Sequence, residues 1–499
     1  MAATTVQRTL IQSLGQLLEQ EVLIRGWVYR LRVLAKTTFI IVKDCTGEAQ
    51  CVAGSESLRA LRVKLDDAIE IRGAVRADDR AKSGVEIDIT SARILNRAAN
   101  ILPFNSSSDI SGVSTETRLE YRPLALRNDW VGDVFRIQAA ILRCFREYLT
   151  SRHFTEIVSS KIVAGGTEGG TNLFAIKYFD RVAYLAQSPQ FYKEHGVAGF
   201  ERVFETGHVY RAEPHATSRH LTEYYSLDFE MGFIDGPEDV IQLERELLTY
   251  VFGRLNEEHA ATLARYRSVP LPSMLDVPIW DFEECLERLH REFGRRDLVD
   301  DLDPEAERQL CRMAEQETGV PAVFVLGFPL SGRPFYTHPR TETSAAGFDL
   351  LFHGLEITTG GQRLHCRADL ERALTSRGIS PASFESHLKM FELGMPPHGG
   401  LAIGLERLTA QILGLQNIRE ASLYPRDRYR VTHRLWWNGF GRGCRKRFRI
   451  GSWFRWFRIR FMDGGGRRHA LDRPRRRGDG RGNVGRGRGH AVDISANTS

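Results

Sequence analysis

Residues 204–231 read FETGHVYRAEPHATSRHLTEYYSLDFEM, a pattern that predicts a strand, a polar loop and a second strand. Because side chains alternate along a strand, Arg211 and Glu213 are expected on one side at the end of the first strand. A guanidinium beside a carboxylate suits a ligand that carries both phosphate groups and an amino-bearing base. Taken alone, the pair also fits a hairpin with a surface salt bridge. Further segments decide between these interpretations, because they supply the other parts of one site.

Two of these segments place polar groups at strand ends. Residues 354–363 read GLEITTGGQR, which predicts a strand whose glycines let the backbone approach a ligand and whose last residue is Arg363. Glu356 and Thr359 offer hard oxygen ligands, the kind that Mg²⁺ takes together with phosphate oxygens. Residues 399–408 read GGLAIGLERL, a strand that turns into a helix. The leucine spacing buries one face of that helix and leaves Arg407 on the opposite side.

A third group of segments supplies an acid and a lysine. Residues 167–170 read TEGG and contain Glu168, whose carboxylate suits an α-ammonium group. Residues 187–193 read QSPQFYK and end at Lys193. Lys193 and Arg363 together suit a substrate with carboxylates.

The charge of the chain is unevenly distributed. The 499 residues carry a net charge of +6, with ordinary fractions of hydrophobic (42%) and charged (26%) residues. Residues 428–499 contain 20 Lys and Arg against 4 Asp and Glu, so they carry +16 and leave −10 for the other 427 residues. Any contact of the main body with nucleic acid must therefore come from local basic patches.

The C-terminal segment, residues 431–499, differs from the rest in composition. It holds four of the seven tryptophans among arginines and glycines. Two interpretations stay open: a disordered RNA-binding arm, or residues translated from a shifted reading frame.

The sequence also predicts where the protein works. No apolar run reaches the length of a membrane span, and the N-terminus lacks the features of a signal peptide. The seven cysteines form no Cys-x-x-Cys pair, which argues against a zinc knuckle or a disulfide scaffold. We therefore expect a cytoplasmic protein without contact to a membrane.

The N-terminal region predicts a small β-barrel. Five short strands in about eighty residues, separated by turn signals, are typical of the OB-fold. Such barrels stack the bases of single-stranded nucleic acid on exposed aromatic rings, and Phe39 is a candidate for this role, although it also fits a plain core position. The expected strands are residues 22–29, 38–43, 49–52, 68–75 and 85–89.

The rest of the chain predicts a mixed helix and strand domain. A polar hinge at residues 105–132 precedes an amphipathic helix that we expect to begin after an N-cap at Asp133 and to end near Arg152. Two acidic helical stretches, 281–295 and 303–317, predict an insertion between strands.

These segments, in this order, resemble the class II aminoacyl-tRNA synthetases, and among them the aspartyl-tRNA synthetases of the archaeal and eukaryotic type. The resemblance covers about residues 15–430. Its three motifs correspond to residues 154–157 (FTEI) with the preceding helix, residues 210–213 (YRAE) with 219–221 (RHL), and residues 404–407 (GLER).

The resemblance implies an α+β fold, in which a five-stranded OB-fold barrel precedes an antiparallel sheet flanked by helices. The expected domains are an anticodon-binding domain at 1–104, a hinge at 105–132 and a catalytic domain at 133–430 with an insertion at about 256–320. The tail at 431–499 lies outside both.

The resemblance further implies that L-aspartate is activated with ATP and Mg²⁺ and transferred to the 3′ end of tRNA(Asp) by a homodimer. Arg211 and Arg407 are the implied catalytic residues. Glu356 and Thr359 are the implied magnesium ligands. The implied aspartate-binding residues are Glu168, Gln190, Lys193, Arg211, Thr359 and Arg363. The implied ATP-binding residues are Arg211, Ala212, Glu213, Arg219, His220, Leu221, Tyr224, Glu356, Gly404, Leu405, Glu406 and Arg407. The implied anticodon-binding residues are Tyr29, Arg32, Phe39, Gln50 and Lys82.

Three alternatives stay open. The first is an enzyme that charges both tRNA(Asp) and tRNA(Asn), because Tyr29 matches neither usual choice of the subfamilies. The second is an asparaginyl-tRNA synthetase, which lacks the lysine that stands here as Lys193. The third is a non-catalytic RNA-binding paralogue, in which we would expect Arg211, Arg363 or Arg407 to be missing, whereas all three are present.

Overall fold

The computed structural model of the chain describes residues 7–54, 61–166, 173–214 and 217–432. Glu168 and nearly all of the predicted tail lie outside these residues. The described residues all belong to one compact unit.

The N-terminal strands close into a barrel in the order β1-β2-β3-β5-β4, which confirms the predicted OB-fold. Alternate side chains of the strands point inward and are fully buried, among them Ile24, Ile40 and Ile71. A β-bulge after Val28 leaves Tyr29 without a cross-strand partner on β2. The strands are β1 (Glu21–Val33), β2 (Thr37–Lys43), β3 (Glu48–Gly54), β4 (Ala68–Ala77) and β5 (Val85–Asn96).

The second part of the chain is built on an eight-stranded sheet of order β12-β13-β14-β15-β16-β11-β10-β6. Its neighbours pair antiparallel, except for the parallel pairs β12–β13 and β10–β6 at the two edges. A separate three-stranded sheet has the order β7-β9-β8. The strands are β6 (Thr155–Glu156), β7 (Ile162–Val163), β8 (Ala175–Tyr178), β9 (Arg181–Leu185), β10 (Arg202–Tyr210), β11 (Glu223–Gly232), β12 (Ile279–Asp281), β13 (Ala322–Leu326), β14 (Gly347–Phe352), β15 (Leu355–Arg363) and β16 (His398–Gly404).

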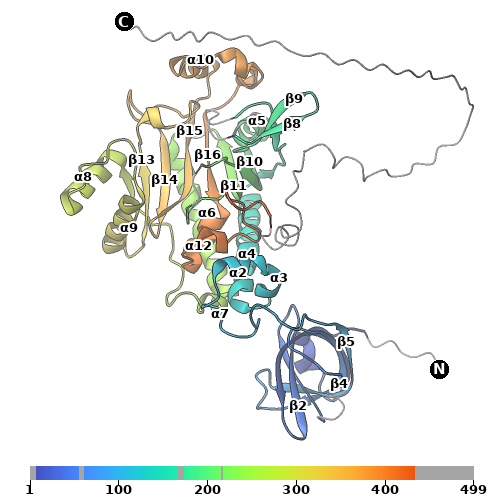
Figure 1. The fold of residues 1–499 in the computed structure, drawn as a ribbon. Helices are drawn as coiled ribbons and strands as arrows, with labels where there is room; N and C mark the ends of the chain where they lie inside the picture. The colour runs from blue at the N-terminus through green and yellow to red at the C-terminus, as the bar shows by residue number, and fades with distance from the viewer. Residues whose placement is uncertain (1–6, 55–60, 167–172, 215–216, 433–499) are drawn as a thin grey trace, which may run out of the picture. The chain divides into compact units, whose positions relative to one another are not determined.

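Long helices cover one face of this sheet and form the largest core with it (Figure 1). Helices α4 (Asp129–Ser151), α6 (Pro237–Glu258) and α12 (Leu405–Leu413) bury their apolar sides against Phe204, Phe229 and Leu401. The other face of the central strands stays open to a cavity, so the fold separates an apolar side from a polar side. The other helices of this part are α5 (Gln190–Phe200), α7 (Ala260–Leu263), α10 (Arg367–Ser376) and α11 (Glu385–Leu388).

The first long helix begins five residues earlier than the sequence analysis predicts. Asn128, not Asp133, is the N-cap, and its side-chain oxygen accepts a hydrogen bond from the Trp130 N–H at 3.1 Å. Asp133 is buried inside the helix, where its carboxylate pairs with Arg136 at 2.7 Å and with Arg265. Asp133 therefore serves a buried ion pair that depends on a distant arginine, which the local sequence pattern does not reveal.

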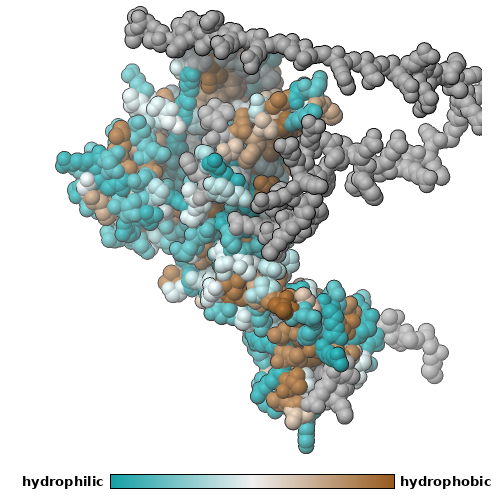
Figure 2. Space-filling model, viewed as in Figure 1, coloured by the Kyte–Doolittle hydropathy of each residue, from teal (hydrophilic) through white to brown (hydrophobic). Residues whose placement is uncertain are grey.

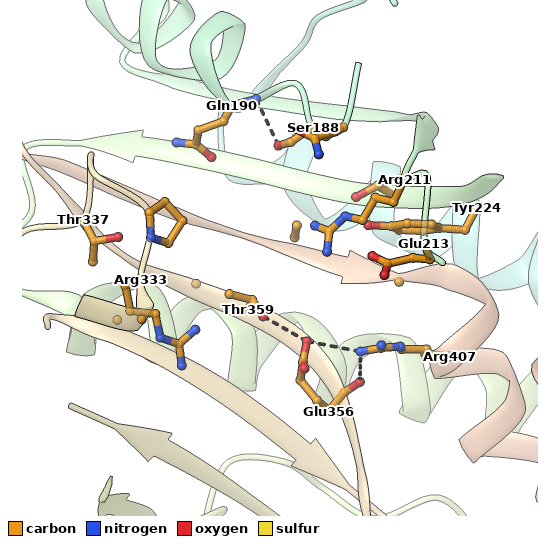
Figure 3. A pocket seen from close by; sticks show the side chains of 18 of the residues that line it. Ser188, Gln190, Arg211, Glu213, Tyr224, Arg333, Thr337, Glu356, Thr359 and Arg407 are labelled. Carbon is orange, nitrogen blue, oxygen red and sulfur yellow. Dashed lines mark hydrogen bonds and ion pairs between the residues drawn. The ribbon is translucent and has the colours of Figure 1, made fainter. Parts of the chain in front are cut away.

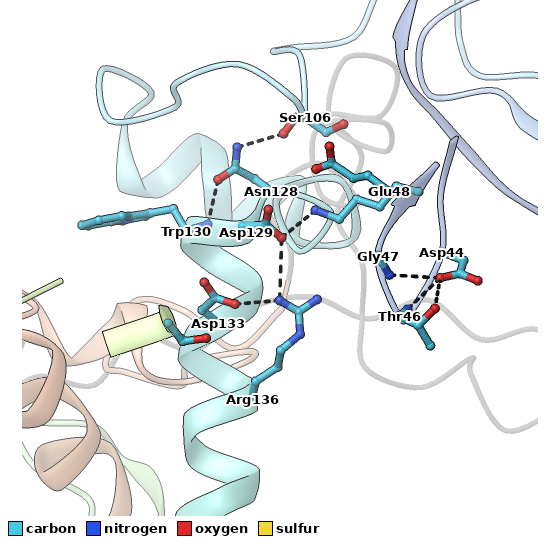
Figure 4. Close-up of polar contacts among 12 residues, drawn as sticks. Asp44, Thr46, Gly47, Glu48, Ser106, Asn128, Asp129, Trp130, Asp133 and Arg136 are labelled. Atoms are coloured by element: carbon cyan, nitrogen blue, oxygen red, sulfur yellow. Dashed lines mark hydrogen bonds and ion pairs between the residues drawn. The ribbon is translucent and has the colours of Figure 1, made fainter. Parts of the chain in front are cut away.

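The predicted hinge is largely structured. It contains α2 (Thr115–Glu120) and α3 (Arg122–Ala125). Polar contacts join it to the barrel: Asp66 accepts from Ser106 Oγ at 2.8 Å, and Lys43 Nζ lies 2.6 Å from the carboxylate of Asp129 (Figure 4). The polar residues that read as a linker are thus held by caps and by partners across the sequence.

The two acidic stretches are helices, α8 (Phe282–Phe293) and α9 (Pro304–Thr318), and they share a small core with side chains of β12, β13 and β14. The surface over them is mostly hydrophilic (Figure 2). In the part of the chain that the structure describes, no helix is both long and apolar enough to cross a membrane.

Candidate active site

A cavity of about 540 Å³ lies on the open face of the sheet, and residues from every singled-out segment that the structure describes line it (Figure 3). Lys193, Ala212 and Leu405 do not line it, and Glu168 lies outside the described residues. The predicted site residues that line the cavity are Gln190, Arg211, Glu213, Arg219, His220, Leu221, Tyr224, Glu356, Thr359, Arg363, Gly404, Glu406 and Arg407.

One side of the cavity is formed by the strand pair β10 and β11. The Arg211 N–H donates to the carbonyl of Thr222 at 3.0 Å, which continues the ladder past the end of β10. The guanidinium of Arg211 lies 5.8 Å from the centroid of the Tyr224 ring, within the range of a cation–π contact. Arg211 and Glu213 both face the cavity, as strand alternation predicts.

The opposite side is formed by β15, where a β-bulge sets the geometry. Leu350 pairs with Thr358 but Leu351 pairs with Glu356, so Ile357 is the extra residue. The bulge brings Glu356 and Thr359 to the same face, although plain alternation would separate them. The Thr359 hydroxyl donates to Glu356 Oε1 at 3.0 Å. Thr358 turns to the other face, where its hydroxyl donates to Glu244 of α6 at 2.6 Å.

Arg407 crosses the cavity to Glu356. Its Nη1 lies 2.8 Å from the backbone carbonyl and 3.2 Å from the carboxylate of Glu356. Burial opposes ionisation of Glu356, but Arg407 and the Thr359 hydroxyl outweigh it and lower the pKa of this carboxyl. Burial of Leu405 and Leu408 on the core side of α12 confirms that Arg407 points away from the core.

A second carboxylate interacts with Glu356 without lining the cavity itself, and the sequence analysis missed it. Asp349 of β14 is held by the two terminal nitrogens of Arg333 at 2.9 and 2.7 Å. Burial and the negative charge of Glu356 raise the pKa of Asp349, whereas Arg333 opposes this. Its only local signal is an aspartate inside the apolar strand of residues 347–352, which a sequence alone does not assign to a site.

The loop between β10 and β11 contacts the insertion. Arg219 forms an ion pair with Glu307 of α9. Burial raises the pKa of Glu307 to about 7, against the effect of Arg219. His220 Nδ1 lies 2.7 Å from the hydroxyl of Thr217. Glu307 is a second residue that the sequence analysis missed, because its partner lies 88 positions away.

Lys193 lies behind the cavity wall, not in it. It is 1% exposed, and its ammonium lies 3.1 Å from Asp228, 3.3 Å from Glu230 and 3.1 Å from the Leu401 carbonyl. Arg363 lines the cavity and donates from Nε to Glu230 at 3.0 Å. A β-carbon on Gly400 would come within 2.4 Å of the Glu230 carboxylate, so only glycine fits there.

A hydrogen-bonded chain continues from this group along α5. Gln190 Nε2 donates to Glu194 Oε1 at 2.8 Å and lies 3.4 Å from Glu230. The other Glu194 oxygen lies 3.2 Å from His387 Nε2, and His387 Nδ1 lies 2.9 Å from His195 Nε2. Glu194 and His387 are buried.

Two residues expected at the nucleotide have structural contacts. The carboxylate of Glu406 accepts the backbone N–H of Tyr225 at 3.2 and 3.0 Å, which fixes the start of α12 against β11. Burial raises the pKa of Glu406 to about 7. Leu405 belongs to the apolar core. Neither side chain is presented to the cavity as freely as Arg407.

The barrel presents most, but not all, of the residues expected to read bases. Arg32 and Phe39 are cross-strand partners, and Gln50 follows on the next strand, where it donates to Glu86 at 2.9 Å. Arg32 and Lys82 are exposed, and Phe39 and Gln50 are half-buried. Tyr29 differs from the expectation. It is 4% exposed, and the Lys43 ammonium covers its ring at 4.3 Å, so no face is left for a base.

Comparison with protein families gives two matches. Residues 114–428 match the model of the class II tRNA synthetases for D, K and N. Residues 22–95 match the OB-fold nucleic acid binding domain.

Individual relatives agree with these matches. The chain is 40% identical to an aspartate–tRNA(Asp/Asn) ligase of Deinococcus radiodurans, over 86% of this chain and 99% of the relative. It is 38% identical to an aspartate–tRNA(Asp) ligase of Pyrobaculum aerophilum, over 82% and 95%. Among solved structures, asparaginyl-tRNA synthetase from Pyrococcus horikoshii with asparaginyl-adenylate is similar with a TM-score of 0.78 and 28% identity, over 86% of this chain and 100% of that chain. A putative aspartyl-tRNA synthetase from Leishmania major has the same TM-score and identity, over 87% and 96%.

Proposed function

The chain belongs to the class II tRNA synthetases of the aspartate, lysine and asparagine group, and on that premise we propose that it is an aspartate–tRNA ligase with the described cavity as its active site. The observation that carries this proposal is the convergence of Arg211, Arg407 and Glu356 on one cavity. The enzyme would join aspartate to ATP as an adenylate and then pass the aspartyl group to tRNA.

ATP fits the end of the cavity that the motif residues form. Tyr224 offers a ring for the adenine, and Glu213 an acceptor for its amino group. Arg407 and Arg219 face the terminal phosphate from α12 and the β10–β11 loop. Arg211 lies between nucleotide and amino acid, where it would neutralise the α-phosphate and the attacking carboxylate as the bond to pyrophosphate breaks. No general base is needed, because the aspartate α-carboxylate is already ionised at neutral pH.

The residues present fit a magnesium ion that arrives with ATP. Glu356 and Asp349 are two neighbouring carboxylates: the charge of Glu356 helps to raise the pKa of Asp349, whereas Arg407 and Arg333 help to lower the pKa of Glu356. In the described ranges no group of three or more His, Cys, Asp or Glu could hold a metal, which agrees with a site that phosphate oxygens complete. Glu356, with Thr359 and Asp349, would hold the ion. When bound, the ion supplies charge neutralisation of the phosphates.

The amino acid fits the other end, at Arg363 and Gln190. Arg363 would pair with the side-chain carboxylate of aspartate, which favours aspartate over asparagine by a charge-assisted bond. Lys193 would support Arg363 from behind by sharing Glu230 with it.

The partners are tRNA and, we propose, a second copy of the chain. Arg32, Phe39 and Gln50 on the barrel would contact the anticodon by stacking and hydrogen bonds. Exposed apolar side chains on and next to the small sheet, namely Val158, Ile162, Phe179 and Val182, support a dimer. A tRNA-charging enzyme whose cysteines are free in the described residues also fits the cytoplasm.

Aspartate-dependent ATP–pyrophosphate exchange tests the proposal, followed by charging of purified tRNA(Asp) and tRNA(Asn). We expect exchange with aspartate and at least hundredfold less with asparagine or lysine. Charging of both tRNAs would identify the enzyme as the non-discriminating form that the Deinococcus name describes. Exchange with asparagine alone would refute the aspartate assignment, and light scattering measures the dimer.

A further inference from the structure

The buried face of helix α5 is polar where a helix normally packs apolar groups. Its buried residues are Gln190, Lys193, Glu194 and Val197, spaced along one face of the helix. Three of these four side chains are polar or charged, and burying such groups is costly unless each one is paired. Lys193 is paired through Asp228 and Glu230, as described above. The role of Glu194 remains to be explained.

Glu194 determines the orientation of the Gln190 side-chain amide. An ionised carboxylate only accepts hydrogen bonds, so the group that faces Glu194 Oε1 at 2.8 Å must be the amide nitrogen of Gln190. Glu230, 3.4 Å away, favours the same orientation of the amide. Its effect is weaker, because Arg363 and Lys193 already contact its oxygens. With the nitrogen held there, the carbonyl oxygen of Gln190 lies 3.5 Å from Arg363 Nη2, at the cavity that Gln190 lines.

His387 lies next to the carboxylate of Glu194. Glu194 is fully buried, and an isolated buried carboxylate would take up a proton and become a donor as well as an acceptor. His387 Nε2 lies 3.2 Å from it, and the His387 ring stacks on Phe191 with 3.9 Å between ring centroids. Although burial opposes it, the nearby His387 ring lowers the pKa of Glu194 to about 2, with contributions from His398 and Gln190. The carboxylate is therefore kept as an acceptor only.

We propose that Glu194, held by His387, is a positioning residue that locks the Gln190 amide so that its carbonyl oxygen, not its nitrogen, meets the amino acid. An acceptor at that place selects a substrate donor, which for an amino acid is the α-ammonium group. The proposal rests on the proposed function, because it assigns a role within the amino-acid end of the same cavity. Glu194 itself does not line the cavity, so its effect on the substrate passes through Gln190.

A double-mutant cycle tests this, with KM for aspartate and for ATP measured by pyrophosphate exchange in the full chain. Glu194→Gln keeps the size of the side chain but can donate as well as accept, so it releases the Gln190 amide. We expect KM for aspartate to rise about tenfold in Glu194→Gln, with KM for ATP within twofold of wild type. In a Gln190→Ala background the same Glu194→Gln change should alter KM for aspartate by less than twofold, because the residue through which it acts is gone.

The controls separate a positioning role from a structural one. Glu244→Gln changes another buried glutamate of the same domain away from the cavity, and both KM values should stay within twofold of wild type. If Glu194→Gln does not fold, His387→Gln takes its place, since it removes the imidazole that contacts Glu194, and a fivefold rise in aspartate KM that vanishes in the Gln190→Ala background is expected.

Additive effects in either cycle, or an equal rise in the KM for ATP, would overturn the proposal. A wild-type chain without aspartate-dependent exchange would instead refute the proposed function, so the two failures are distinguishable.

Discussion

The charges of Lys193 and Arg363 are already matched before a substrate arrives. Lys193 faces Asp228 and Glu230, and Arg363 shares Glu230, so two cations oppose two carboxylates. An aspartate side chain therefore competes with these carboxylates for donors instead of meeting an uncompensated positive charge. Selectivity for aspartate then depends on the donors that Arg363 turns to the cavity, with Lys193 as a second cationic partner of the two acids.

Replacing Lys193 by methionine tests this arrangement. Lys193→Met leaves Asp228 and Glu230 with one cation between them, so we expect the folded state to lose about 3–5 kcal/mol of stability. We also expect kcat/KM for aspartate to fall by a factor that corresponds to about 2–4 kcal/mol. Adding Asp228→Asn should restore most of the stability, because it removes the unpaired charge, but not the use of aspartate. Urea unfolding and pyrophosphate exchange measure the two effects. A Lys193→Met enzyme with wild-type KM for aspartate would contradict the role in selectivity.

Arg211 is expected to act in chemistry and not in RNA binding. In Arg211→Ala the α-phosphate loses its positive partner, and adenylate formation should fall by about 3 kcal/mol or more, on the order of a hundredfold to a thousandfold. Binding of labelled tRNA should stay within twofold, because the barrel lies far along the chain from this strand end. Arg181→Ala, an exposed arginine on β9, is the matched control. Loss of tRNA binding with intact exchange would place Arg211 elsewhere.

At the scale of elements, local patterns predicted what local geometry decides. The leucines of α12 correctly placed Arg407 away from the core, and strand alternation correctly placed Arg211 and Glu213 together. The bulge at Ile357 was not predictable, because it depends on the pairing of β15 with β14. Asp349 and Glu307 were missed for a related reason: each becomes a site residue only through a partner that the fold brings to it. Sequence reasoning thus found the motif residues but not Asp349 and Glu307, which interact with them.

The contact between α6 and β15 makes stability depend on pH. Burial raises the pKa of Glu244 from 4.5 to about 8, although Thr358 opposes the shift. Below pH 4.5 the carboxyl is neutral in both states, and as pH rises toward 8 only the unfolded chain loses the proton, so the folded state loses stability. Glu244→Gln should remove this part of the pH dependence, about 1.4 kcal/mol per pH unit.

Urea unfolding of wild type and Glu244→Gln at pH 6.0 and 7.5 checks the sign, since the variant should gain about 2 kcal/mol on wild type between these values. Parallel pH profiles for the two proteins would contradict the raised pKa, because they would mean that Glu244 is ionised in the folded chain.

At the scale of the molecule, the composition predicted two folded parts and a tail of different character. The barrel and the sheet domain follow from strand spacing and from motif order, and both are present. The segment predicted as a hinge contains two short helices, because its polar residues cap helices and bind distant side chains such as Asp66. The segment around residues 419–430 shows the same effect. Arg430 is 4% exposed and pairs with Glu116 and Glu120 of α2, although nothing in its local sequence indicates burial.

Removing residues 431–499 tests where the functional chain ends. Arg430 and the Arg426 carbonyl, which accepts from the Thr222 N–H at 3.0 Å, tie the preceding segment to α2 and to the strand that carries Tyr224. A chain that ends at Arg430 should therefore keep pyrophosphate exchange within twofold of the full chain. In that shortened chain, Arg430→Ala should cost about 1–2 kcal/mol of stability, because it removes a buried guanidinium that pairs with Glu116 and Glu120, whereas the exposed Arg428→Ala should cost less than about 0.5 kcal/mol. If the tail binds RNA, the KM for tRNA should rise on truncation. The KM of the shortened chain should also depend less on salt concentration than that of the full chain. Unchanged tRNA kinetics would fit a tail without a selected role, and loss of exchange on truncation would mean that the tail takes part in the folded enzyme.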